Sequence, residues 1–173
     1  MNIILFGPPG AGKGTQSKYL IHKLKGFQVS TGDMLRDEIQ KNTDIGKKIT
    51  DDMNNGKFVN DEIVNNIIKS VITDPNKKGK LIFDGYPRSL SQAKNLDLLL
   101  NNSNQKIDFI FFLNVNKDTI IKRIEKRKNE EKRSDDDSGT ILKRYDTYME
   151  TTKPVLDFYS KNSNFYEIDG TLK

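Results

Sequence analysis

A glycine-rich segment near the amino terminus has the residue types and spacing of a phosphate-binding loop. Residues Gly7–Thr15, with the sequence GPPGAGKGT, follow an apolar run at 3–6 and precede a helical pattern at 16–25. Glycines allow backbone N–H groups to approach a phosphate closely, and the start of a helix adds partial positive charge. The pattern G-x-x-x-x-G-K places Lys13 where it reaches the outer phosphates of a nucleotide. The segment therefore predicts a binding site for a nucleoside triphosphate.

The residue after this lysine departs from the general pattern. It is Gly14, and the hydroxyl group comes one residue later, at Thr15. We therefore expect Mg²⁺ to be held through nucleotide phosphates and water, without a direct protein ligand. Thr15 and Asp84 are the nearby oxygen groups, because Asp84 follows a predicted strand at 80–83 and parallel sheets bind ligands at that end of their strands.

Several arginines are placed where they can meet further phosphate groups. Arginine has a planar fork that matches phosphate oxygens, and phosphoryl transfer is catalysed mainly by positioning and by positive charge. Part of the set lies in a charged run at 122–133, a pattern that is also typical of a solvated helix face. The arginines are Arg36, Arg88, Arg123, Arg127, Arg133 and Arg144.

The elements that must position these residues alternate between strands and helices. Strands are expected at 2–6, 27–30, 80–83, 107–115 and 165–168. The alternation predicts an α/β fold with a parallel sheet of about five strands. The longest apolar run, 107–115, predicts a central strand. The intervening helical patterns include 13–25, 117–128 and 139–160, a strand-free helical block at about 31–72, and a stretch at 128–137 that predicts a mobile loop.

Composition indicates one soluble domain. The chain has 173 residues, of which 34% are hydrophobic and 31% charged, and this length suffices for one proper core. No apolar run approaches the roughly 18 residues that a membrane helix needs. The sequence contains no cysteine, which excludes disulfides and thiolate zinc sites. Because the first strand begins at once, we expect no signal peptide and a cytoplasmic enzyme.

Three segments resemble the signatures of nucleoside monophosphate kinases, and most closely those of adenylate kinases. They are Gly7–Thr15, Ser30–Arg36 and Asp84–Arg88, and the similarity extends from Met1 to Thr171. The resemblance implies transfer of the γ-phosphoryl group of MgATP to AMP, which gives two ADP.

The resemblance also implies an organisation for the chain. Residues 1–173 would form one domain, a P-loop NTPase-type parallel sheet flanked by helices. A helical arm at about 30–59 would bind the nucleoside monophosphate, and a short lid at about 127–137 would close over the site. We expect a monomer that binds ATP and AMP, with no nucleic-acid or membrane partner.

Three sets of site residues follow from the resemblance. The ATP site comprises Gly10, Ala11, Gly12, Lys13, Gly14, Thr15, Arg123, Arg127 and Leu172. The AMP site comprises Thr31, Arg36, Lys57, Val59, Gly85, Arg88, Gln92, Arg133 and Arg144. The catalytic residues are Lys13, Arg88, Arg123, Arg127, Arg133 and Arg144. Within the AMP site, the arginines at 36 and 88 clamp the α-phosphate, and Thr31 and Gln92 face the adenine.

Two departures from the family pattern affect these expectations. Only the five residues 128–132 separate Arg127 from Arg133, where many bacterial adenylate kinases carry a lid domain, often with a cysteine-based zinc site. We therefore expect a short-lid form without zinc, because so few residues cannot build a core of their own. The family also has a further helix after Thr171 that this sequence lacks. Its absence is expected to lower stability and to leave Leu172 weakly positioned.

Two other functions remain open on the sequence alone. A UMP/CMP kinase would share the fold and the mechanism. In such kinases alanine usually replaces the threonine at 31, and an asparagine closely follows the arginine of the third signature. This sequence has Thr31, Ser89 and Gln92, which favours AMP. A basic nucleotide-binding module without kinase activity is supported only by the charged run and the net charge of +5.

Overall fold

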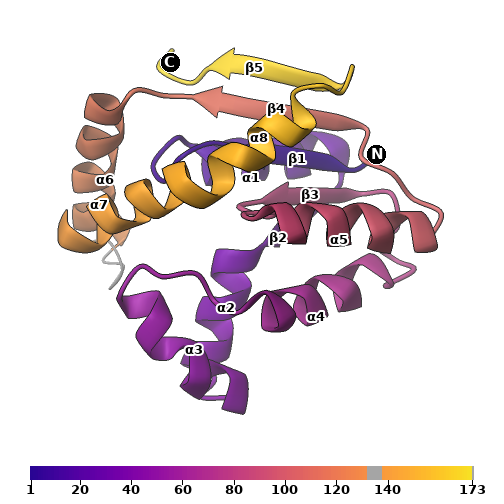
Figure 1. The fold of residues 1–173 in the computed structure, drawn as a ribbon, viewed down its shortest axis with the longest axis horizontal. Helices are drawn as coiled ribbons and strands as arrows, with labels where there is room; N and C mark the ends of the chain where they lie inside the picture. Colours follow the sequence, from indigo (N-terminus) through magenta and orange to yellow (C-terminus); the bar gives the residue numbers. More distant parts are fainter. Residues whose placement is uncertain (132–137, 173) are drawn as a thin grey trace.

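Parallel strands form one sheet at the centre of the molecule in a computed structural model (Figure 1). The structure describes residues 1–131 and 138–172, without the side chains of 127–131, 138, 140 and 141. In this part of the chain the sheet has five strands in the order β2-β3-β1-β4-β5, and every neighbouring pair is parallel. The strands are β1 (Ile3–Phe6), β2 (Phe27–Ser30), β3 (Leu81–Asp84), β4 (Phe109–Asn114) and β5 (Phe165–Asp169).

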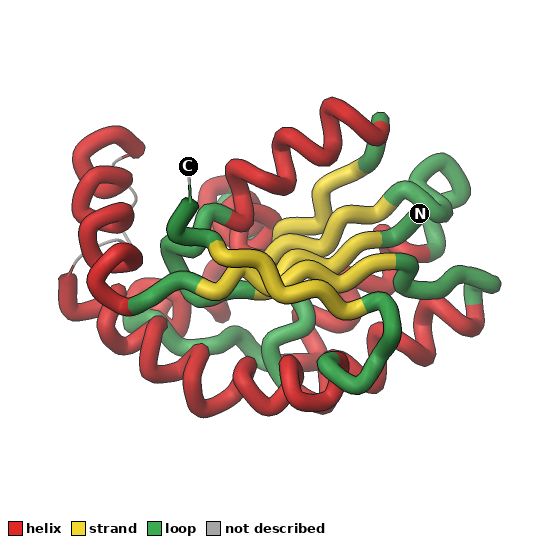
Figure 2. The backbone as a smooth tube through the Cα atoms, turned by 90° about the horizontal axis from the view of Figure 1, so that it is seen from above, coloured by secondary structure: helices red, strands yellow, loops and turns green. Residues whose placement is uncertain are grey.

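Helices cover both faces of this sheet (Figure 2). Helix α1 packs on one face, and helices α4, α5 and α8 pack on the other. Helices α2 and α3 extend away from the sheet below β2, and α6 and α7 stand beside the strand ends (Figure 1). Within the described residues the helices are α1 (Lys13–Leu24), α2 (Thr31–Gln40), α3 (Asp44–Asn54), α4 (Asp61–Ile72), α5 (Leu90–Asn102), α6 (Lys117–Glu131), α7 (Ser138–Thr147) and α8 (Lys153–Tyr159).

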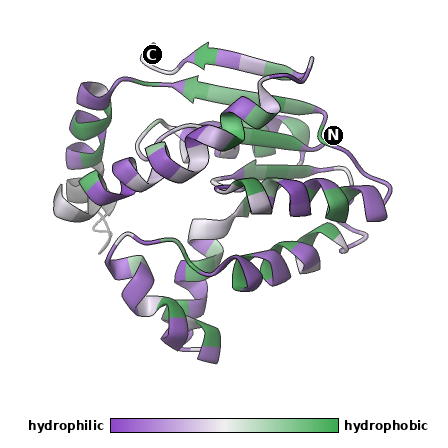
Figure 3. Ribbon diagram, viewed as in Figure 1, coloured by the Kyte–Doolittle hydropathy of each residue, from purple (hydrophilic) through white to green (hydrophobic). Residues whose placement is uncertain are grey.

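The alternation of side chains along β1 divides the core into two layers. Ile4 and Phe6 belong to the larger layer under α4, α5 and α8, whereas Ile3 and Leu5 belong to the smaller layer that packs against α1. Successive side chains of a strand point to opposite faces, so a strand covered on both sides must be apolar throughout. Figure 3 shows this continuous hydrophobic colouring along β1 and one-sided colouring on the helices.

Helices α2, α3 and α4 begin where the sequence supplies capping side chains. The Ser30 hydroxyl accepts a hydrogen bond from the N–H of Asp33 at the start of α2, and Thr43 accepts one from Gly46 in α3. The Asn60 side chain accepts from the N–H of Glu62 in α4. Each bond satisfies a donor that the first helical turn leaves without an intrahelical partner. These caps fix the ends of the segments that carry the 30–59 region.

The structure confirms the predicted α/β class, and it differs from the sequence-based expectations in three places. The longest apolar run forms β4, which is an interior strand, but the central strand is the shorter β1. Helix α6 runs to Glu131, so the predicted loop is helical at 128–131. Its Lys, Glu and Arg residues are good helix formers, and this explains the continuation. Residues 132–137 of the predicted lid lie outside the described residues.

The third difference concerns the helix predicted at 139–160. The structure has α7, a π-helical turn at Tyr148–Thr152, and then α8. Pro154 is the second residue of α8 and lacks the N–H that would bond to the carbonyl of Glu150. The wider π turn accommodates this missing bond. Among the described residues, no helix is both long and apolar enough to cross a bilayer.

Candidate active site

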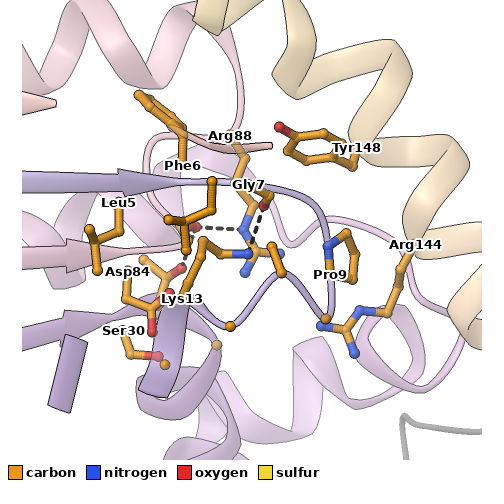
Figure 4. A pocket seen from close by; sticks show the side chains of 18 of the residues that line it. Leu5, Phe6, Gly7, Pro9, Lys13, Ser30, Asp84, Arg88, Arg144 and Tyr148 are labelled. Carbon is orange, nitrogen blue, oxygen red and sulfur yellow. Dashed lines mark hydrogen bonds between the residues drawn. The ribbon is translucent and has the colours of Figure 1, made fainter. Parts of the chain in front are cut away.

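A cavity of about 920 Å³ opens at the carboxyl ends of the strands (Figure 4). Its wall includes a residue at or near the end of each strand: Phe6, Ser30, Asp84, Leu113 and Asp169. Open parallel sheets bind ligands at this edge, and the volume falls within the range of roughly 300–1,000 Å³ for small-molecule sites. The glycine-rich loop lines one side of the cavity and the arm lines the other, so both predicted nucleotide sites open into the same cavity.

The glycine-rich loop adopts the conformation that its glycines allow. Gly10 and Gly12 have φ angles of 81° and 96°, in the left-handed region that side chains disfavour. Gly12 precedes α1 and offers no capping side chain. The N–H groups of the first turn of α1 are therefore left for a bound anion, and the helix dipole adds to their positive potential. This is the geometry of a phosphate site.

Lys13 folds its side chain back over the loop. Its Nζ donates to the carbonyl oxygens of Gly7, at 2.7 Å, and Pro8, at 3.0 Å (Figure 4). The two contacts hold the ammonium group at the mouth of the loop, inside the cavity. A phosphate bound by the loop would lie next to this charge.

Apolar packing fixes the loop against α6. Ala11 is buried in a cluster with Leu113, Val115, Ile120 and Ile124. A Cβ atom at Gly10 would lie 2.8 Å from the Cγ1 of Ile124, so the backbone approaches α6 as closely as a glycine permits. The loop conformation therefore depends on tertiary packing as well as on its own sequence.

Arg123 ties the same loop to the carboxyl end of the chain. Its guanidinium donates to the carbonyl oxygen of Ala11 at 3.3 Å and to that of Gly170 at 2.7 Å. The side chain also lines the cavity. Arg123 thus contributes positive charge beside the loop while it connects the loop to the segment after β5.

The opposite wall of the cavity is built from side chains that are distant in the sequence. Thr31 and Gln92 are only 4% and 3% exposed, and both line the cavity. The Thr31 hydroxyl donates to the carbonyl oxygen of Gly85 at 3.1 Å. Arg88 donates to the same oxygen through Nε at 2.6 Å, and its backbone N–H donates to Gln92 Oε1 at 2.8 Å. These bonds join α2, the loop after β3 and α5 into one wall.

Arg88 is further held by the elements around it. Its carbonyl oxygen accepts a bond from the Thr152 hydroxyl at 3.0 Å, and its guanidinium lies 5.4 Å from the centre of the Phe58 ring. Cation–π contacts of this kind favour one placement of a guanidinium group. The positive charge of Arg88 therefore points into the cavity from a fixed backbone (Figure 4).

Asp61 stabilises the Gln92 side chain from behind. The Gln92 Nε2 group donates to Asp61 Oδ1 at 2.5 Å, and the Ser89 hydroxyl donates to Oδ2 at 3.1 Å. Ser91 also donates to Oδ2. Asp61 is not among the site residues predicted from the sequence, because an acid just after the helix cap Asn60 is typical of any helix N-terminus. Its position, two residues after the cavity-lining Val59, gives no stronger signal.

Further positive groups line the cavity from other elements. Arg36 lies on α2 and donates to Asp33 Oδ1 at 2.6 Å, and Lys57 comes from the end of the arm. Arg144 comes from α7 (Figure 4). Tyr148 is part of the same wall, and burial raises the pKa of its hydroxyl, so it stays protonated at neutral pH. A cavity lined by many cations suits a ligand with several negative charges.

The structure brings nearly all of the predicted site residues to this cavity. Arg133 lies outside the described residues, and so does the side chain of Arg127. The others line the cavity, namely Gly10, Ala11, Gly12, Lys13, Gly14, Thr15, Thr31, Arg36, Lys57, Val59, Asp84, Gly85, Arg88, Gln92, Arg123, Arg144 and Leu172. Leu172 is 74% exposed, so most of its side chain is in contact with solvent.

The oxygen groups near the loop fit Mg²⁺ carried by a nucleotide. Within the described part of the chain, no group of three or more His, Cys, Asp or Glu residues forms a metal cluster. Asp84 and Thr15 both line the cavity, and a Cβ atom at Gly14 would lie 3.6 Å from Asp84 Oδ2. Asp84 accepts a bond from Gln28 Nε2 at 3.2 Å. A single carboxylate and a hydroxyl suit an ion that keeps waters and phosphate oxygens as ligands.

Comparison with known proteins extends the similarity beyond the site. The family model described as Adenylate kinase matches residues 5–164. A Pelagibacter ubique protein named Adenylate kinase is 49% identical over 98% of this chain and 92% of its own length. Proteins of the same name from Mycoplasma mycoides and Maricaulis maris are 44% and 40% identical, over 97% and 98% of this chain and 91% and 90% of their own lengths.

The alignments also differ in length. The Pelagibacter alignment spans 196 positions, more than the 173 residues of this chain, so that relative carries inserted residues. The Maricaulis alignment spans 170 positions and needs no such insertion. Similarity of this kind follows nearly the whole length of each protein and is not confined to the phosphate loop. This chain therefore belongs to the adenylate kinase family.

Proposed function

We propose that the chain transfers the γ-phosphoryl group of MgATP to AMP and so forms two ADP. The observation that carries this proposal is the construction of the cavity. A phosphate loop lies on one side of it, and a fixed arginine with a buried amide, Arg88 and Gln92, lies on the other. A nucleotide hydrolase needs only the first of these sites. A kinase that transfers a phosphoryl group from one nucleotide to another needs both.

The reaction is an in-line displacement. An oxygen of the AMP α-phosphate attacks the γ-phosphorus of ATP while the bond from that phosphorus to the β–γ bridging oxygen breaks. One ADP forms from AMP, and the other leaves with the bridging oxygen. Because the attacking phosphate is already an oxyanion, no side chain needs to act as a strong base. The work of the protein is to align the two phosphates and to neutralise their charge.

The loop and Lys13 hold the phosphates of ATP, and Lys13 follows the transferred group. In the acceptor half, Arg36 and Arg88 bind the α-phosphate of AMP, and Thr31 and Gln92 face its base. Lys57, Val59 and Gly85 complete the AMP site through the backbone. This arrangement is supported by the hydrogen bonds of the wall. Thr31 and Arg88 donate to the same carbonyl oxygen of Gly85, and the Gln92 amide accepts from the Arg88 N–H.

The remaining cations act between the nucleotides. Arg123 and Arg127 serve the ATP side, where Leu172 contributes an adenine contact, and Arg133 and Arg144 meet the phosphates from the lid side. Mg²⁺ carried by the ATP phosphates would supply further neutralisation, and Thr15 and Asp84 would hold it through water. The arm at about 30–59 and a short lid at about 127–137 close to exclude water. The enzyme works as a cytoplasmic monomer.

A coupled assay of ADP formation tests this function. MgATP is supplied with AMP, CMP, UMP or GMP, one acceptor at a time. We expect strong turnover with AMP alone. Preferred turnover of CMP or UMP would overturn the base assignment but keep the phosphoryl transfer. ATP binding without turnover of any acceptor would contradict the kinase proposal.

A further inference from the structure

Gln92 is held by two partners that allow only one orientation of its amide group. A carboxylate accepts hydrogen bonds, so the atom that faces Asp61 at 2.5 Å must be the Nε2 donor. A backbone N–H donates, so the atom that faces Arg88 N at 2.8 Å must be Oε1. A flipped amide would place donor against donor at one end and acceptor against acceptor at the other. The orientation is therefore set by chemistry on both sides.

The Asp61 carboxylate is itself fixed. Its Oδ2 atom accepts from the hydroxyls of Ser89 and Ser91, and Ser89 in turn accepts from the N–H of Gln92 as the cap of α5. Asp61 is the first residue of α4, directly after its cap Asn60. The carboxylate thus connects the start of α4 to the start of α5 and leaves Oδ1 to the amide. This network lies behind the cavity wall.

The two bonds leave half of the amide for a ligand. An amide has two N–H donors and two acceptor lone pairs. One donor is used on Asp61 and one lone pair on Arg88, so one donor and one acceptor remain. Gln92 is 3% exposed and lines the cavity. A base that reaches it meets an acceptor and a donor in a fixed order.

We propose that Asp61 is a positioning residue that makes this site select a 6-amino purine over a 6-oxo purine. The inference rests on the proposed function, in which Gln92 faces the base of the monophosphate. Adenine presents an N6–H donor beside the N1 acceptor, which complements the remaining acceptor and donor of Gln92. Hypoxanthine has the same size but presents an O6 acceptor beside an N1–H donor. It meets the fixed amide with both bonds reversed.

The network explains why the amide cannot adapt to hypoxanthine. A flip of Gln92 would break the bond to Asp61 and the bond to the Arg88 N–H together. Buried polar groups that lose their partners are a strong source of discrimination between similar substrates. Asn at position 61 would remove part of this restraint, because a neutral amide can turn and offer either a donor or an acceptor.

The test compares AMP with IMP as acceptors for the whole chain. We measure kcat/KM for both in the unmodified enzyme and in Asp61→Asn. We expect the AMP/IMP ratio to fall by about fivefold, because a charged hydrogen bond is replaced by a neutral one that permits the flip. The KM for ATP should not change. The ratio does not depend on the folded fraction, since unfolded protein lowers both rates equally.

Asp44→Asn is the matched control. Asp44 is the first residue of α3 and follows the cap Thr43, as Asp61 follows Asn60, but its side chain is 95% exposed and pairs with Lys47. We expect its AMP/IMP ratio to equal that of the unmodified enzyme. Asp61→Ser is a second test variant, because serine keeps a polar group at the start of α4 but is too short to reach the amide. It should also lower the AMP/IMP ratio of kcat/KM.

The outcomes separate this inference from the proposed function. Equal losses for AMP and IMP in both Asp61 variants would show a merely structural role and overturn the inference alone. An unchanged AMP/IMP ratio in Gln92→Ala would also overturn it, because the amide would then not face the base. Absence of AMP turnover in the unmodified enzyme would overturn the proposed function, and the inference with it.

Discussion

The two walls of the cavity are built in different ways. The phosphate loop is one continuous segment, and it acts through backbone groups, a helix start and Lys13. The acceptor wall joins Thr31 to Arg88 and Gln92 by side-chain hydrogen bonds, and Asp61, from a third segment, holds Gln92 from behind. The first wall offers N–H groups and charge, which any triphosphate can use. The second offers a fixed pattern of donors and acceptors, which in the proposed function selects a base.

This difference between the two walls indicates which of them can distinguish one nucleotide base from another. A loop that contacts phosphates cannot distinguish one base from another, since all nucleotides share those groups. Selection must come from buried side chains whose unmet hydrogen bonds penalise the wrong ligand. Damage to the loop should therefore reduce turnover of every acceptor alike. Damage to the acceptor wall should change the ranking of acceptors.

The largest effect is expected from Lys13→Met. We expect kcat to fall by about 10²–10³-fold or more, because a cation that stabilises the transferred group is lost. The KM for AMP should change little, since the acceptor wall is intact. Steady-state kinetics with AMP measure kcat and KM, and circular dichroism checks that the fold is intact. Lys23→Met, an exposed position on the same helix, is the control. Turnover close to that of the unmodified enzyme would contradict the role of Lys13.

A smaller but distinct effect is expected from Gly10→Ala on stability. The new Cβ would lie 2.8 Å from Ile124, at a φ of 81°. Backbone strain and overpacking should together lower the free energy of unfolding by about 2–3 kcal/mol. Gly12→Ala shares the strain, at a φ of 96°, but its Cβ meets nothing within 4 Å, so about 1 kcal/mol is expected. Urea unfolding compares the two. Equal losses would show that packing on α6 does not fix the loop.

The same contrast explains how much was predictable from the sequence. The phosphate loop could be identified because its residues are contiguous and its strand and helix follow a known order. The role of Asp61 could not, because its partner Gln92 is 31 positions away and the acid resembles an ordinary helix-capping residue. Likewise, an apolar run predicts a buried strand but not its order in the sheet, which depends on the pairing of all five described strands.

Thr31→Ala is expected to have a moderate effect that is confined to the acceptor wall. It removes the bond to the Gly85 carbonyl, which keeps its bond from Arg88 Nε. We expect kcat/KM for AMP to fall by about fivefold, as for one net hydrogen bond, while the KM for ATP stays constant. Turnover of CMP should fall less, so the AMP/CMP ratio narrows.

Thr50→Ala is the control for that substitution. The Thr50 hydroxyl donates to the carbonyl oxygen of Gly46 at 2.7 Å, within α3 and away from the cavity wall. It removes the same kind of bond from the same arm. Equal losses of AMP turnover in both variants would indicate a general effect on the arm and not a contact with the base.

The smallest effect is expected from Asp97→Asn, which tests whether α5 serves the acceptor wall only through its first turn. Asp97 lies on α5 with Gln92 and accepts a hydrogen bond from the Tyr159 hydroxyl at 3.1 Å. Burial raises the pKa of the Asp97 carboxyl above its ordinary value of 3.8. The folded chain therefore binds this proton more tightly than the unfolded chain, so stability falls as the pH rises through the raised pKa.

Asparagine removes that dependence because it carries no charge to bury. Asp97 is part-exposed, so solvent screens its charge and the effect is small. At pH 7 the variant should be more stable than the unmodified chain by no more than ~0.5 kcal/mol, and below the ordinary carboxyl pKa the two should be equal. Urea unfolding at both pH values measures the difference. The AMP/IMP ratio should remain that of the unmodified enzyme. A changed ratio would mean that the whole of α5, and not the Asp61–Gln92–Arg88 network, sets the orientation of the amide.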